Sequence, residues 1–374
     1  MTPASKLPLH LDPQTNLPIF TQLRQQITWL IASGDLKPGD RLPNIRALGA
    51  QLGIHWHTVR QAYLALEEDG LVETRRKRGT YVTSADIYRL ARRTSNLPSH
   101  TIGVLVPSRN PFYSPYLQGI EDVARKNNDL LFTCYTLFDK ESPDRFTRQL
   151  IAKGVDGIIA TSLESAILQS NGGPFPSNLP PVVYVDDPVQ KKNSIVIDNE
   201  GAAFSLTDHL IKKHRYRRIG LITCPIAWQN VRDCYDGYRR ALAEAGIEFD
   251  ESLVVEVPFF TPDCGYQGAQ HLLGMKSPPR AIFAVADILA VGAVQAIKEA
   301  GKRIPEDIAI VGYNNIEVTA LMDPPLTTAS VPTYEMGVEA MTMLNRLRAG
   351  RPVEKKRIVM STALVVRRSC GCKS

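Results

Sequence analysis

Four basic residues stand together near the end of the first quarter of the chain, and their chemistry points to a polyanion. Arg75, Arg76, Lys77 and Arg78 precede Gly79, between two short runs rich in apolar and β-branched residues. A turn that carries four cations is costly to bury, but it neutralises phosphate groups well. The pattern predicts contact with nucleic acid, and a solvated basic hairpin without a partner is the alternative.

Three short helices and a two-stranded hairpin are predicted to position this turn. Apolar residues at helical spacing indicate helices at 19–33, 44–52 and 56–68, and a glycine follows each of them closely. Strands at 71–75 and 80–83 flank the basic turn. This is the layout of a winged helix-turn-helix, whose third helix enters the major groove of DNA.

The distribution of charge favours the same end of the chain. The 374 residues carry a formal net charge of +6. Residues 1–84 hold ten Lys and Arg against seven Asp and Glu, which gives +3, and residues 85–100 add +2. The remaining 274 residues carry only +1. The positive excess therefore lies where a nucleic-acid partner is predicted.

The segment 20–82 resembles the DNA-binding domain of the GntR family. The matching text includes PIFTQL, IASGDLKPGDRLP, HTVRQAYLALEEDGLV and RRKRGTYV. The resemblance implies contacts with double-stranded operator DNA from the arginine after the LP turn, from the start of the third helix and from the wing tip. Those positions are Arg46, His55, Trp56, His57, Thr58, Arg60, Arg78 and Gly79.

The start of the third helix departs from the pattern of that family. The family usually has Ser-Arg-x-Thr where this chain has His55-Trp56-His57-Thr58. An indole replaces an arginine that would read guanine, so the operator sequence cannot be transferred from relatives. Two alternatives stay open for Trp56: contact with a thymine methyl or a sugar, or packing against the second helix.

Beyond residue 100, short apolar strands alternate with amphipathic segments of helical length. This alternation predicts parallel sheets with helices on both faces, and about 275 residues is large for one sheet. We therefore expect an α/β fold with two parallel-sheet lobes and a ligand between the carboxyl ends of strands. Strands are predicted at 101–106, 130–135, 157–162, 182–187, 194–199, 218–223, 253–258, 281–287 and 308–315, and helices at 119–127, 201–213, 234–245 and 290–300.

The segment 101–369 resembles the effector domain of the LacI/GalR family, which is similar to periplasmic sugar-binding proteins. Matching stretches include TIGVLVPSRNPFYSPYLQGIE, GVDGIIATS, PPVVYVDD and PPLTTASVP. A GntR-type head on a LacI-type body resembles the architecture of arabinose repressors of the AraR type. This architecture implies a transcription regulator with a sugar-like effector. The predicted divisions are a head at 1–84, a linker at 85–99 and an effector-binding and dimerisation domain at 100–374.

We expect a homodimer, because two paired bodies would let two heads address the half-sites of a near-palindrome. The effector site itself can be argued from chemistry. A sugar needs aromatic faces for its C–H surfaces and bidentate polar groups for its hydroxyls. The candidate effector-binding residues are Asn110, Phe112, Tyr113, Asp186, Asp187, Trp228, Arg232, Asp287 and Asn314. For the polar residues at strand ends, the alternative is a side chain satisfied by backbone groups.

Three polar positions usual in that family are altered. Cys234 stands where relatives carry a ligand-binding arginine, Ala286 where asparagine is common, and Asn314 where aspartate is common. These changes favour a less hydroxylated or differently charged ligand, or a cleft that responds to a partner protein.

Several other function classes are not expected. The sequence has no GxxxxGK[ST] phosphate loop, HExxH or GxSxG motif, so no enzyme is predicted. Cys370 and Cys372 have no second cysteine pair nearby to complete a four-ligand zinc set, so reduced cysteines, no metal and no cofactor are expected. No apolar run approaches the roughly 18 residues of a membrane helix. The first residues lack a secretory signal, which favours a cytoplasmic protein.

Overall fold

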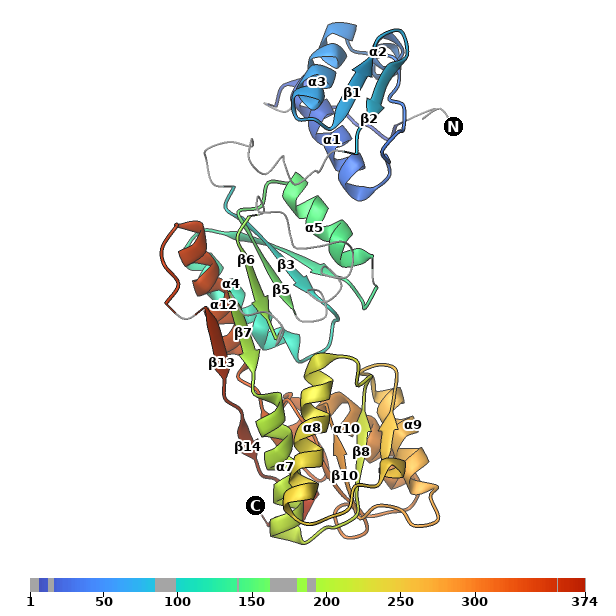
Figure 1. Ribbon diagram of the computed structural model, residues 1–374, viewed down its shortest axis with the longest axis vertical. Coiled ribbons are helices and arrows are strands. Elements are labelled where there is room, and N and C mark those ends of the chain that lie inside the picture. The colour runs from blue at the N-terminus through green and yellow to red at the C-terminus, as the bar shows by residue number, and fades with distance from the viewer. Residues whose placement is uncertain are drawn as a thin grey trace.

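The structure is a computed structural model, and it describes residues 7–12, 17–84, 99–139, 141–161, 180–186, 193–354 and 356–373. Figure 1 shows a small head followed by two α/β lobes along the long axis of the molecule. The predicted linker lies outside the described residues apart from its last position, Ser99. Among the helices in the described ranges, none combines the length and the apolar character needed to cross a membrane.

The head has the predicted winged helix-turn-helix layout. Its elements are α1 (Ile19–Ser33), α2 (Ile45–Leu52), α3 (Trp56–Glu68), β1 (Val72–Arg75) and β2 (Gly79–Val82). The apolar positions that predicted the helices form one core, in which Leu23, Leu48, Val59 and Leu66 are fully buried. The two strands pair antiparallel, with Arg75 opposite Gly79. The basic turn therefore forms the tip of the wing.

The first lobe after the head contains a six-stranded parallel sheet in the order β13-β7-β6-β5-β3-β4. The elements of this lobe are β3 (Thr101–Val106), α4 (Tyr113–Lys126), β4 (Leu130–Tyr135), α5 (Ser142–Ala152), β5 (Gly157–Thr161), β6 (Val182–Val185), β7 (Ser194–Ile197), α12 (Thr333–Arg348) and β13 (Arg357–Met360). Every residue of β5 is buried, as expected for a strand covered on both faces. Helices α4 and α12 approach so closely that a Cβ on Gly119 would lie 2.1 Å from the carbonyl oxygen of Tyr334.

The second lobe contains a four-stranded parallel sheet in the order β11-β10-β8-β9 and an antiparallel pair, β12 with β14. Its elements are α7 (Asn199–His214), β8 (Ile219–Thr223), α8 (Gln229–Glu244), the 3-10 turn η2 (Glu251–Leu253), β9 (Val254–Glu256), α9 (Pro262–Leu273), β10 (Ala281–Ala284), α10 (Asp287–Glu299), β11 (Ala309–Val311), α11 (Val318–Leu321), β12 (Thr328–Ser330), β14 (Ala363–Val365) and the 3-10 turn η3 (Arg368–Cys370). The predicted fold class, α/β with two parallel-sheet lobes behind a small head, is confirmed.

The chain passes between the two lobes at 197–199, 330–333 and 360–363. The helix α12 and the strand β13, which come late in the sequence, therefore complete the first lobe. Neither was predicted, and β13 in particular has only four residues with alternating exposure. Several short connections between two packed lobes are the usual basis of hinge closure around a ligand.

Several predicted strands of the body run past the observed ends, and the predicted helices begin too late. The strand predicted at 194–199 stops at Ile197, and α7 begins at 199 rather than 201. The cause is Asp198, whose carboxylate accepts a hydrogen bond from the amide of Gly201 at 2.9 Å and so caps α7. A polar residue after a buried strand is thus the start of the next helix.

Candidate functional site

Three aromatic rings gather at the start of α3. His55 is the N-cap, and its Nδ1 accepts a hydrogen bond from the amide of His57 at 3.3 Å. This bond assigns the neutral imidazole the tautomer with hydrogen on Nε2, which leaves a donor for a ligand. The indole of Trp56 stacks on the ring of His57 with centroids 3.7 Å apart. Donors and aromatic faces therefore lie at the positive end of the helix dipole, where phosphate is favoured.

Trp56 is half-buried, whereas His55, His57 and Arg60 are exposed. A Cβ on Gly49 of α2 would lie 3.3 Å from the Cα of Trp56, so α2 contacts the backbone of this residue. The indole instead stacks with an exposed histidine, which favours the DNA-facing alternative for the ring.

The remaining predicted residues of the helical part are Arg46 and Thr58. Arg46 is exposed in the first turn of α2, where its amide donates to Oδ1 of Asn44 at 3.0 Å. Thr58 is half-buried and donates its amide to the carbonyl of His55 at 3.0 Å. Both lie in first helical turns, so each side chain is held at the start of its helix.

The four cations of the wing fall into two groups, one engaged within the hairpin and one at its exposed tip. Arg75 is engaged within the hairpin: its Nε donates to Glu73 at 2.8 Å and its guanidinium lies 4.8 Å from the ring centroid of Tyr81. Arg76, Lys77 and Arg78 are exposed at the tip. These three are therefore the wing cations best placed to meet phosphate.

The predicted wing glycine, Gly79, has a structural reason to be glycine. Its φ is 110°, and a Cβ there would lie 2.8 Å from Nε of Arg41. Arg41 is exposed, and its backbone forms an isolated antiparallel β-bridge with Tyr81 of β2. The sequence interpretation missed this arginine, although it immediately precedes the LP turn in the matching text GDRLP. It extends the basic surface from the wing toward α2.

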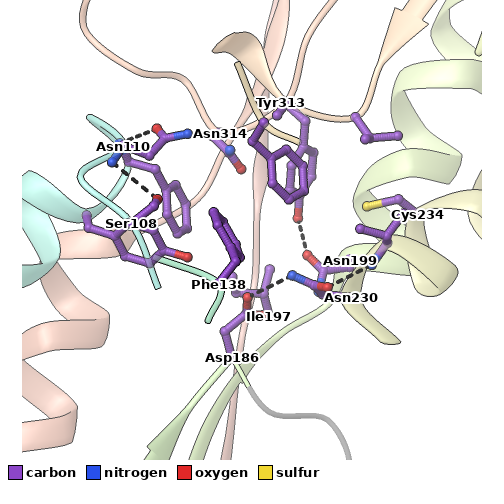
Figure 2. A pocket seen from close by; sticks show the side chains of 16 residues that line it. Ser108, Asn110, Phe138, Asp186, Ile197, Asn199, Asn230, Cys234, Tyr313 and Asn314 are labelled. Atoms are coloured by element: carbon purple, nitrogen blue, oxygen red, sulfur yellow. Dashed lines mark hydrogen bonds between the residues drawn. The ribbon is translucent and has the colours of Figure 1, made fainter. Parts of the chain in front are cut away.

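A pocket of about 630 Å³, counted with its open mouth, is lined by both lobes (Figure 2). Five of the predicted effector-binding residues line it: Asn110, Phe112, Tyr113, Asp186 and Asn314.

Local backbone geometry aims these residues into the pocket. Oδ1 of Asn110 accepts the amide of Phe112 at 3.0 Å, which turns the loop after β3 into α4. Asp186 and Asn314 follow strands with φ of 56° and 114°. A left-handed conformation of a residue other than glycine costs on the order of 1–3 kcal/mol and is concentrated at functional sites.

The lobes touch across the pocket through polar and aromatic contacts that the sequence interpretation missed. Nδ2 of Asn230, at the start of α8, donates to Oδ2 of Asp186 at 3.3 Å. The ring of Phe138, from the loop after β4, projects into the pocket (Figure 2). It also stacks parallel on Trp228, with ring centroids 5.8 Å apart. Asn199 also lines the pocket, where its Oδ1 accepts the hydroxyl of Tyr313 at 2.7 Å.

Two other predicted effector residues do not line the pocket. Trp228 is not among the lining residues; its ring stacks on Phe138, which lines the pocket. Arg232 is exposed, and its Nε donates to the carbonyl of Ile226 at 3.1 Å, so it holds the loop before α8. A further predicted residue, Asp187, lies outside the described residues.

Asp287 also differs from its prediction, because its carboxylate is fully buried in the second lobe. Its oxygens accept the hydroxyl of Thr328 at 2.8 Å and the amide of Ile316 at 2.9 Å. Burial raises the pKa of Asp287 from 3.8 to about 6. The residue therefore organises the loop after β11 instead of meeting a ligand.

The pocket wall carries little charge. Cys234, at the position of the family's arginine, lines the pocket, and burial raises the pKa of its thiol, so it stays neutral. Among the lining residues that the structure describes, Asp186 is the one charged side chain. The rest of the described lining includes five aromatic residues: Phe112, Tyr113, Phe138, Phe260 and Tyr313.

Comparison with known proteins gives two family matches. Residues 20–82 match the gntR family of bacterial regulatory proteins, and residues 207–370 match the periplasmic binding protein-like domain. The chain is 32% identical over 283 residues to the HTH-type transcriptional repressor CytR of Escherichia coli strain K12, which covers 75% of this chain and 82% of that protein. It is 30% identical over 312 residues to the repressor PurR of Pasteurella multocida, covering 82% and 91% respectively.

A solved structure extends the similarity to a ligand complex. The LacI family regulator of Enterococcus faecium with bound ribose superposes with a TM-score of 0.63 at 28% identity, covering 72% of this chain and 98% of that one. The relatives are transcription regulators, and the matching head is a DNA-binding domain. The chain therefore belongs to the bacterial transcription regulators with a LacI-type, periplasmic-binding-protein-like body, and it carries a DNA-binding head of the gntR family.

Proposed function

We propose that the protein is a cytoplasmic repressor that binds operator DNA as a homodimer and whose operator affinity is set by a neutral, sugar-like effector. The observation that carries this proposal is the pocket lined by both lobes, with the Asn230–Asp186 hydrogen bond and the Phe138–Trp228 stack across it. A ligand bound there contacts both lobes at once. It therefore stabilises one lobe arrangement over another.

The lining favours an uncharged polyol. Aromatic faces suit the C–H surface of a sugar ring, and the amides and carboxylate of Asn110, Asn230 and Asp186 suit hydroxyls. The described lining lacks a lysine or arginine, so a phosphorylated or carboxylated ligand would have no counter-charge from it. The ribose in the Enterococcus faecium regulator supports a neutral sugar for this fold.

Coupling to DNA follows from the dimer. Two heads reach two half-sites only at one spacing, so a change in lobe closure that alters the pairing of the bodies changes operator affinity. The predicted DNA contacts are Arg46, the start of α3 and the wing tip. The predicted linker would transmit the change between body and head.

The proposal is tested with the full-length protein and a sugar panel that contains ribose, arabinose, cellobiose and glucose 6-phosphate. We expect at least one neutral sugar to raise the melting temperature and to change operator affinity in a fluorescence anisotropy titration, whereas the sugar phosphate does neither. Asn230→Ala should weaken the response. Gln229→Ala is the matched control, because Gln229 bonds Asp233 outside the pocket lining.

The alternative is a body that acts only as a dimerisation or protein-interaction module. It would be supported if every neutral sugar left both the melting temperature and operator affinity unchanged. A chain that bound no duplex DNA at all would contradict both versions.

A further inference from the structure

A second cluster of chemically active side chains lies where the C-terminal tail meets the end of α7, and none of its residues lines the pocket. His209 and His214 come from α7, and Cys370 and Cys372 from the tail. Their four ligand atoms lie within 4.8 Å of one another. Figure 1 shows the C-terminal end beside α7. We propose that these four residues form a zinc-binding site that fastens the tail to α7.

The distances fit a tetrahedral ion. Nε2 of His209 lies 3.5 Å from Sγ of Cys370 and 3.7 Å from Sγ of Cys372, and Nε2 of His214 lies 3.3 Å from Sγ of Cys372. A tetrahedral zinc ion with Zn–S of about 2.3 Å and Zn–N of about 2.0–2.1 Å sets neighbouring sulfur and nitrogen atoms about 3.6 Å apart. Three of the six edges of the required tetrahedron therefore match, and all four atoms lie within 4.8 Å of one another.

Gly371 makes this arrangement possible. Its φ is 104°, a conformation that favours glycine, and it turns the tail so that Cys370 reaches His209 while Cys372 reaches both His209 and His214. A Cβ at this position would lie 3.2 Å from Nδ1 of His214. A side chain here would therefore strain the turn and crowd a ligand.

The surroundings suit a bound ion. Cys370 is fully buried, and the hydroxyl of Thr327 lies 3.1 Å from its sulfur, placed to donate to a thiolate as an outer-shell partner. The other three ligands are half-buried, which leaves a path for entry. Two thiolates balance the charge of Zn²⁺, and a Cys₂His₂ set is typical of structural zinc.

The site would act on the stability of the second lobe. The tail is already held up to Cys370, because the hydroxyl of Ser369 donates to the carbonyl of Ile310 at 2.6 Å on β11. Beyond Cys370, a zinc ion would join Cys372 to His209 and His214 in the C-terminal part of α7. Ions that bind the folded but not the unfolded chain stabilise it by mass action.

The sequence expectation of no metal site rested on the missing second cysteine pair. The two histidines that complete the set lie more than 150 residues before the cysteines in the sequence. Helix α7 places His209 and His214 five residues apart, and the fold then brings the tail to them. The ligand set is therefore visible only in three dimensions.

The test uses reduced, chelator-treated full-length protein titrated with Co²⁺ and then with Zn²⁺. We expect one Co²⁺ per chain, the visible absorption of tetrahedral cobalt with thiolate charge transfer, displacement by Zn²⁺, and a higher melting temperature with Zn²⁺. Zinc should also protect Cys370 and Cys372 from alkylation, as read by mass spectrometry. This protection assigns the ligands even if a variant fails to fold.

Variants separate this site from other thiols and imidazoles. Cys372→Ser and His214→Ala should weaken Co²⁺ binding by more than the roughly 10- to 100-fold that loss of an outer-shell partner costs. Cys134→Ser, at a half-buried cysteine of β4, and His271→Ala, at an exposed histidine of α9, should bind as wild type. The proposal is overturned if reduced protein takes up no metal, if uptake survives both ligand variants, or if the cysteines instead form a disulfide that zinc does not prevent.

Discussion

The DNA-binding head and the proposed effector pocket assemble their predicted site residues in opposite ways. The predicted DNA contacts all lie between Arg46 and Gly79, on one pair of helices and one hairpin. The pocket lining runs from Ser108 to Asn314 and draws on both lobes. A site built from neighbouring elements can be recognised from local pattern, whereas a site between lobes depends on which strand ends the fold brings together.

The two regions also differ in charge. The head presents Arg41, Arg60 and the three cations of the wing tip to solvent. The described pocket lining has one carboxylate and no cation. The head is therefore suited to binding through electrostatics that salt screens, whereas the proposed effector would bind through shape, aromatic faces and hydrogen bonds that salt affects little.

Asp287 should set a pH dependence of stability rather than of ligand binding. Its pKa is raised from 3.8 to about 6 by burial, so the folded chain holds this proton more tightly than the unfolded chain. Its contribution to the free energy of unfolding is therefore most favourable below about pH 4. It decreases by on the order of 3 kcal/mol as the pH rises from about 4 to about 6. Urea unfolding of wild type and Asp287→Asn between about pH 4 and pH 7 measures the difference in slope.

The asparagine variant cannot titrate, so its unfolding free energy should lack this component. An identical pH dependence of the two proteins would contradict the assignment. A loss of sugar response in Asp287→Asn without a change in stability would indicate that Asp287 acts in sugar binding.

Asp186→Asn should weaken binding of the sugar that raises the melting temperature by about 1.5–3 kcal/mol, because a carboxylate acceptor is replaced by an amide. Isothermal titration measures the loss. Operator affinity without sugar should stay at the wild-type value, since Asp186 belongs to the pocket and not to the head. Asp263→Asn, at an exposed position in the first turn of α9, is the control. Equal losses in both variants would argue against a specific contact.

The positions of Asp186 and Asp287 show how much of the pocket lining could be predicted from the sequence. Both are acidic residues soon after apolar strands, and pattern alone predicted the same role for both. Asp186 reaches the pocket because its backbone turns left-handed at the end of β6. Asp287 starts α10, and its side chain bonds Ile316 and Thr328 in the core. That difference depends on packing between segments that are distant in sequence.

The fold itself was more predictable, because it follows from periodicity. Apolar runs predicted the buried sheet strands well, as at β3, where the predicted and observed limits agree. Strand ends failed where a polar residue became a helix cap, as at Asp198. The short strands β12 and β14, which pair antiparallel with each other outside the parallel sheets, were not predicted. Likewise Asn230 was missed, since only the lobe arrangement places it beside Asp186.

In the head, Arg60→Ala should weaken operator binding by about 1–3 kcal/mol if the guanidinium reads a base edge. Arg60 is exposed in the second turn of α3, one turn beyond His57. Fluorescence anisotropy with operator and with unrelated duplex measures both affinity and specificity. The loss should be larger for the operator. Arg125→Ala, at an exposed arginine of α4 in the body, should change neither value.

Lys77→Asn tests the wing and should have the smallest effect. Lys77 is exposed at the tip with φ of 62°, a conformation that asparagine tolerates, so the substitution removes charge and keeps the turn. Loss of one phosphate contact should reduce the slope of log affinity against log salt concentration by about 1 and weaken operator and unrelated duplex equally. Lys276→Asn, at an exposed site of the body, should leave the slope unchanged. A Lys77 variant that lost specificity but kept the slope would mean that the wing reads bases, and the contrast between a base-reading helix and a phosphate-binding wing would then fail.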